Sequence, residues 1–354
     1  MKNIYSELAE AVDRIGFGFP KTLIGAERAL LKKFFSKDDA RHFLDMQEGY
    51  QTPQAYAEKN GMDPQKAEEI LDGMARRGLI YRRRLKEGPQ YRQYPGIFGF
   101  IDFQVHNPDT SWATPTGIYI AMSKFGQAMS ASMPSYRSVP MHKEFVEGSK
   151  ILPYDDIEAI LERHTRFSVA RCLCRIMFQM KPGNKCDHPM ETCIATDEMA
   201  DFYMENGWGR SITREETLAI LREGEKDGRI INVTNSKDGE SICSCCECGC
   251  GMLWLKKKFP GPSKDYWSNY FITVDESKCG SCGSCTQKCH FGILSLKQGK
   301  LSIQTADCLG CGLCITACPK GALKLRRKPE DKVYVPPETY DDAIEIWQKN
   351  RAEG

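Results

Sequence analysis

Two cysteine runs near the end of this 354-residue chain constrain its fold more than any other feature. Each run has the spacing Cys-x2-Cys-x2-Cys-x3-Cys, the first from Cys279 to Cys289 and the second from Cys308 to Cys318. Two-residue spacers bring three thiolates to three corners of one metal–sulfide cube, and the fourth Cys reaches the neighbouring cube. The spacing predicts two [4Fe-4S] clusters, one on Cys279, Cys282, Cys285 and Cys318, the other on Cys308, Cys311, Cys314 and Cys289.

The two runs are also an internal repeat, because the segments that follow them, 292–296 and 321–325, match at the same offset. Residues from about 270 to 326 resemble the bacterial two-[4Fe-4S] ferredoxins, which implies electron transfer. That family usually has Pro after the fourth Cys of both runs. Pro319 fits the pattern, but His290 follows Cys289 and adds a donor that could alter the local reduction potential. Paired zinc knuckles would need a different spacing.

All seventeen cysteines lie between Cys172 and Cys318. A secreted disulfide scaffold would need an export signal, and the first ten residues carry charges where its apolar stretch would lie. We therefore expect metal ligands in the reducing cytoplasm of an anaerobe. The net charge of +2 requires neither a nucleic acid nor a membrane partner. No apolar run has the length of a membrane span.

A second metal-binding region is predicted over residues 151–262. Strand-like alternation over 167–175 would place Cys172 and Cys174 on one face, and the flanking Arg171 and Arg175 could lower thiolate pKa values. Structural zinc is the competing hypothesis. We favour one or two further iron–sulfur clusters, because the neighbouring clusters need a redox partner within reach. The spacing leaves the partition open among Cys172, Cys174, Cys186, Cys193, Cys243, Cys245, Cys246, Cys248 and Cys250.

A winged helix is predicted over residues 37–105. Thr52-Pro53 and Asp63-Pro64 are typical helix starts, and the segments 79–84 and 91–94 read as a hairpin. In such a fold the helix over 63–77 would enter the DNA major groove. Because that helix is acidic over its first turns, phosphates would be repelled. A partner-docking role is therefore favoured over DNA binding, despite basic residues at Arg76, Arg77, Arg82, Arg83, Arg84 and Lys86.

The sequence thus predicts an α+β chain with five parts. These are a helical and winged-helix domain (1–105), a linking arm (106–150), a cysteine-rich metal-binding domain (151–262), a two-[4Fe-4S] ferredoxin-like domain (263–330) and a tail helix (331–354). Residues 96–103 alternate like a strand. Apolar residues of the tail helix, among them Trp347, are expected to dock on the body or on a partner.

The leading functional hypothesis is an electron-transfer protein that relays electrons between the two C-terminal clusters and a partner oxidoreductase, by way of the middle cysteines. The combination of a winged helix, the two cysteine patterns and the ferredoxin-like tail resembles iron–sulfur proteins of strict anaerobes. One alternative is a redox-sensing DNA-binding regulator, and another is an oxidoreductase with catalysis at an open middle cluster. No nucleotide-binding or metalloprotease motif is present, and the sequence does not indicate an oligomeric state.

Overall fold

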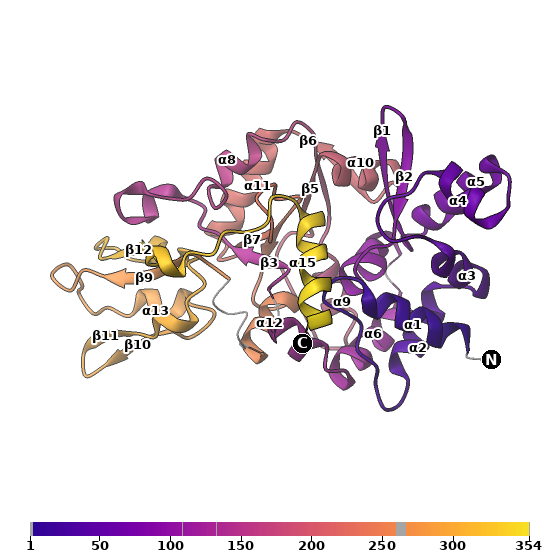
Figure 1. The fold of residues 1–354 in the computed structure, drawn as a ribbon. Coiled ribbons are helices and arrows are strands. Elements are labelled where there is room, and N and C mark those ends of the chain that lie inside the picture. Colours follow the sequence, from indigo (N-terminus) through magenta and orange to yellow (C-terminus); the bar gives the residue numbers. More distant parts are fainter. Residues whose placement is uncertain (1–2, 108, 132, 260–266, 354) are drawn as a thin grey trace.

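The computed structural model describes residues 3–107, 109–131, 133–259 and 267–353. Helices and strands are mixed, as the predicted α+β class requires. Three regions follow one another along the molecule (Figure 1): N-terminal helices at one end, a six-stranded sheet in the middle, and a C-terminal module with short strands at the other end. Within these described ranges no helix is both long enough and apolar enough to cross a membrane.

The N-terminal region has five helices and one antiparallel hairpin, in the order expected from the sequence. Ser36 caps the third helix, and its side chain accepts a hydrogen bond from the Asp39 amide. Thr52 caps the fourth, which ends at Gly61 in the left-handed conformation. The elements are α1 (Ile4–Arg14), α2 (Ala26–Phe34), α3 (Lys37–Asp45), α4 (Pro53–Asn60), α5 (Pro64–Arg76), β1 (Tyr81–Leu85) and β2 (Gly88–Arg92). The winged-helix assignment itself stays a prediction.

The strand expected over 96–103 is wrong. The chain forms a π-helical turn at Ile97–Ile101 and a 3-10 helix at Asp102–His106. The alternation was misleading because side chains on both sides of this segment, including Ile97, Phe100 and Phe103, are buried. The segment also passes so close to the preceding chain that a Cβ on Gly99 would lie 3.2 Å from the Tyr94 carbonyl oxygen.

The middle sheet has the strand order β3-β7-β8-β5-β4-β6, with every neighbouring pair antiparallel. Helices α10 and α11 pack on it, α10 against β4, β5 and β6 and α11 against β7. The elements are β3 (Tyr136–Ser138), α8 (Ile157–Leu161), β4 (Phe167–Arg171), α9 (Leu173–Gln179), β5 (Glu191–Thr196), α10 (Asp197–Glu205), β6 (Gly209–Ile212), α11 (Arg214–Lys226), β7 (Ile230–Thr234), β8 (Ser241–Cys245) and α12 (Gly251–Lys258).

One expectation about this region needs correction. The strand predicted over 167–175 ends at Arg171, and Cys172 is the N-cap of α9, so Cys172 and Cys174 do not share a strand face. The predicted linking arm is structured: it contains α6 (Thr110–Met122) and α7 (Phe125–Ala131), and it supplies the edge strand β3. The sequence did not predict these helices and this strand, because the segment mixes Gly, Pro, Ser and Met without a clear hydrophobic period.

The C-terminal module repeats a small unit of helix and strand. Its elements are β9 (Tyr270–Val274), α13 (Ser284–Lys288), β10 (Leu294–Lys297), β11 (Lys300–Ile303), α14 (Leu313–Thr316) and β12 (Leu323–Arg327), with β9 paired to β12 and β10 to β11. The predicted tail helix is present as α15 (Tyr340–Glu353), and Trp347 in it is buried against the body. The predicted domain boundary at 262–263 lies outside the described residues.

Candidate metal centres

The eight cysteines of the C-terminal runs gather in the two predicted sets. Cys279, Cys282, Cys285 and Cys318 line one small pocket. Gly283 precedes α13 with φ +77°, a conformation that favours glycine. In the other set, burial together with Cys308 and Cys289 raises the pKa of Cys311 to about 12, so these thiols lie close together. Cys314 is buried beside them.

The comparison with family models agrees with this geometry, since residues 278–323 match a 4Fe-4S dicluster domain. The C-terminal module is a ferredoxin-like iron–sulfur domain. No curated protein and no solved structure matches the chain. Each [4Fe-4S] cluster needs four thiolate ligands, and these eight cysteines supply the ligands of two such clusters.

A second centre lies at the middle sheet, where seven cysteines line one cavity of about 90 Å³. Such a volume is large for a packed protein interior. Cys193 on β5 and Cys243 on β8 are cross-strand partners, and Cys245 lies two residues further along the same face of β8. The starts of α9 and α12 contribute three more, and Cys246 follows β8. The cavity is called the six-thiol cavity after the six cysteines other than Cys246: Cys172, Cys174, Cys193, Cys243, Cys245 and Cys250.

These six thiols perturb one another strongly. Contact with the Cys174 thiol and burial raise the pKa of Cys172. The thiols of Cys243 and Cys250 instead lower the pKa of Cys245. A metal that binds here must displace protons, because only thiolates are ligands. Six sulfur donors around one cavity exceed the four that an iron–sulfur cluster needs, and leave two thiols beyond that need.

Cys186, Cys246 and Cys248 form a compact group of their own, and Cys246 also lines the six-thiol cavity. Arg175 stands between the two groups. It is fully buried, it lines the six-thiol cavity, and its Nε donates to Cys246 Sγ at 3.3 Å. Its other donors reach Thr192 Oγ1 and the Ser244 carbonyl. Arg171, the other predicted flanking arginine, lines the cavity but is largely exposed to solvent.

Sequence reasoning missed two polar groups at the cavity. Burial raises the pKa of Asp102, in the cavity wall, to about 7. Burial lowers the pKa of Lys256 to about 8, and its ammonium donates to Ser138 and Asn232. The sequence could have indicated Asp102, because a single acidic residue inside the apolar run 97–105 is unusual. The sequence could not have indicated Lys256, because this residue belongs to a run of three lysines that resembles a solvent-exposed linker.

Two side chains, His290 and Lys256, lie where the cysteines of the ferredoxin-like domain meet those of the middle region. His290, next to Cys289, places Nδ1 2.9 Å from Glu247 and Nε2 2.6 Å from the Gly228 carbonyl oxygen. Glu247 lies between Cys246 and Cys248 in the chain. Lys256 is near enough to Cys245, Cys250 and Cys311 for all three to favour its charged form. The second ferredoxin set therefore faces the middle cysteines.

Proposed function

We propose that the protein transfers electrons between the two clusters of its ferredoxin-like domain and an iron–sulfur cluster held by the six-thiol cavity, and onward to a partner oxidoreductase in the cytoplasm. The clusters would supply one-electron redox chemistry. The observation that carries the proposal is the interface: the residue after Cys289 is hydrogen-bonded to the residue between Cys246 and Cys248.

Charge supports the same arrangement. Both cluster sites would carry negative charge when their clusters are bound. The two sites would therefore repel each other unless cationic side chains lie between them. Lys256 lies between Cys250 and Cys311, and Arg175 lies between the two middle groups. Both side chains are buried, where such interactions are screened least.

His290 offers a direct test. His290→Ala removes the hydrogen bonds to Glu247 and Gly228, and we expect electron exchange between the ferredoxin-like domain and the middle site to slow several-fold. The measurement is freeze-quench EPR after rapid anaerobic reduction, with iron content determined on the same samples. Lys278→Ala is the matched control, because Lys278 also adjoins a ligand, Cys279, but pairs only with Asp275. Equal rates in both variants would remove the interface from the electron path.

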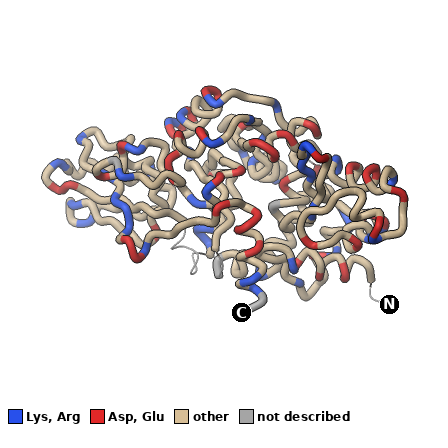
Figure 2. The backbone as a smooth tube through the Cα atoms, turned by 45° about the horizontal axis from the view of Figure 1, so that its top comes forward, with Lys and Arg blue, Asp and Glu red and all other residues tan. Residues whose placement is uncertain are grey.

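For the N-terminal domain we propose docking of a protein partner and not DNA binding. The basic residues near the hairpin are already engaged: Arg82 pairs with Asp72 and with Glu205 at 2.6 Å, and Arg84 pairs with Glu205 at 2.8 Å. Acidic and basic residues are interspersed along the backbone in the view of Figure 2. A mobility shift of duplex DNA at low salt would contradict this assignment.

A second candidate function is reduction of a small substrate in the six-thiol cavity, and Asp102 favours it. A carboxyl group with a pKa of about 7 can deliver a proton at neutral pH.

The reduction potential of the middle site should therefore depend on pH. Reduction of that site adds negative charge near Asp102 and favours the protonated carboxyl group, so the potential should fall as pH rises through 7. We expect a slope approaching about 59 mV per pH unit in an EPR-monitored titration. Asp102→Asn should abolish this slope, and a slope that survives would exclude Asp102 as the proton source.

A further inference from the structure

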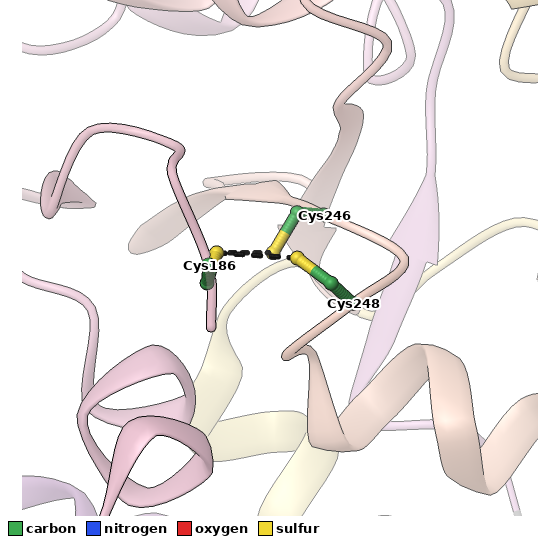
Figure 3. Close-up of side chains that lie close together, drawn as sticks. All are labelled: Cys186, Cys246 and Cys248. Carbon is green, nitrogen blue, oxygen red and sulfur yellow. Dashed lines mark hydrogen bonds between the residues drawn. The ribbon is translucent and has the colours of Figure 1, made fainter. Parts of the chain in front are cut away.

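Cys186, Cys246 and Cys248 form the most compact thiol group that the structure describes. Their sulfurs converge from two loops (Figure 3), and all three lie within 4.8 Å of one another. Cys246 Sγ is 3.8 Å from Cys186 Sγ, and Cys248 Sγ is 3.1 Å from Cys186 Sγ. In the described part of the chain, no other set of three or more Cys, His, Asp or Glu ligand atoms is gathered so tightly.

These distances discriminate between two kinds of metal site. Ligands of one tetrahedral Zn²⁺ lie about 2.3 Å from the ion, which places their sulfurs about 3.8 Å apart. In a cubane each thiolate binds a different iron and points outward from its corner, so the sulfurs lie farther apart. The two ferredoxin sets, which have the cubane spacing, do not form such a compact group among the described residues. The two printed sulfur separations, 3.8 and 3.1 Å, are at or below the single-ion spacing, so the triad is compact enough for one ion and too compact for a cubane.

The surroundings fit an ion held by three thiolates. Such a centre carries a net charge of about −1, since three thiolates exceed the charge of a divalent ion by one. The buried guanidinium of Arg175 donates to Cys246 Sγ and can balance that charge. The carboxylate of Glu247 is directed to Lys257 and His290, at 2.6 and 2.9 Å. No fourth Cys, His, Asp or Glu ligand atom of the described residues joins the group, and Cys248 is exposed.

We propose that Cys186, Cys246 and Cys248 bind one tetrahedral divalent ion, Zn²⁺, with the fourth position open to water or to a small ligand. Soft thiolate donors in tetrahedral geometry favour zinc over magnesium, calcium or manganese. The nine middle cysteines then comprise three that hold an ion and six others that line the cavity, and Cys246 of the triad also lines that cavity. This division does not depend on the electron-transfer role, because a zinc ion neither accepts nor donates electrons.

The test is a paired metal analysis of the full-length protein, purified anaerobically with zinc and iron both supplied. We expect one zinc per chain in the wild type, and loss of that zinc with unchanged iron and sulfide in Cys248→Ser. Because Cys248 is exposed, this change should leave the fold intact. Cys193→Ser, in the six-thiol group, is the matched control and should keep its zinc. Loss of several iron atoms from Cys248→Ser would show that the triad belongs to a cluster and overturn the proposal.

A second readout does not depend on the variant. Protein grown with Co²⁺ in place of zinc should show visible absorption bands of tetrahedral cobalt and sulfur-to-cobalt charge transfer in the near ultraviolet. Both should be absent from Cys186→Ser. A zinc or cobalt ion that remains in both triad variants would show that the ion is bound elsewhere, and its absence from the wild type would refute the site.

Discussion

Cys243→Ala is expected to lose about four iron atoms and four sulfides per chain, the content of one cubane. Cys243 occupies the centre of the six-thiol wall, opposite Cys193 across the strand pair, with Cys245 two residues beyond it. An alanine there removes a donor that no neighbouring backbone atom can replace. The loss should be read from anaerobic iron and sulfide assays, and from disappearance of one EPR component after dithionite reduction.

Two controls make this loss specific. Cys248→Ser should keep its iron, because it belongs to the triad, and Cys282→Ser should lose iron from the ferredoxin-like domain alone. The reduced signals of that domain should persist in Cys243→Ala. If the iron content of Cys243→Ala equals that of the wild type, Cys243 is not a required ligand of an iron–sulfur cluster, and this prediction is wrong.

Trp347→Ala is expected to lower the free energy of unfolding by about 3–5 kcal/mol. The Trp347 side chain is fully buried, packs edge-on against Phe17 and Tyr340 at ring distances of 5.2 and 5.6 Å, and donates Nε1–H to the Met133 carbonyl at 2.7 Å. Truncation leaves a cavity and an unpaired carbonyl oxygen, and both are costly. The measurement is anaerobic chemical denaturation followed by far-ultraviolet circular dichroism.

Ile346→Ala is the matched control, because Ile346 belongs to the same helix but is 38% exposed. Its cost should stay within about 0.5 kcal/mol, the usual range for surface positions. Comparable destabilisation by both substitutions would mean that burial of the indole does not govern the stability contributed by α15, since alanine itself favours the helix.

The sequence predicted what is encoded locally. The ferredoxin spacing specifies which thiols share a cluster because each set comes mainly from one short loop, and the caps at Ser36 and Thr52 specify helix starts within four residues. The division of the middle cysteines was not predictable, because it depends on the register between β5 and β8, which lie about fifty residues apart. Adjacent residues Cys245 and Cys246 both line the cavity, but only Cys246 also lies in the compact triad.

The same limit explains the errors at 96–103 and 167–175. An apolar alternation cannot distinguish a strand from a turn that is buried on all sides. A strand that ends at Arg171 and a helix that begins at Leu173 have no glycine or proline between them to mark the change. The hydrogen bond of His290 to Glu247 joins residues 43 positions apart and depends on how two domains pack, so no local pattern predicts it.

The path of the chain between the ferredoxin-like domain and α15 has a kinetic consequence. Tyr334 donates its amide to Asn269, and the amides of Lys237 and Asp238 donate to the carbonyls of Pro337 and Glu338, so this return segment is fastened to the middle region along its length. Asn269 belongs to the ferredoxin-like domain, and Lys237 and Asp238 belong to the middle region, so the return segment is attached to both. A carrier on a loose tether must diffuse to meet its partner, and its rate depends on linker length and solvent viscosity. Here the donor and acceptor are held in one orientation, so internal electron exchange should be first order and insensitive to viscosity.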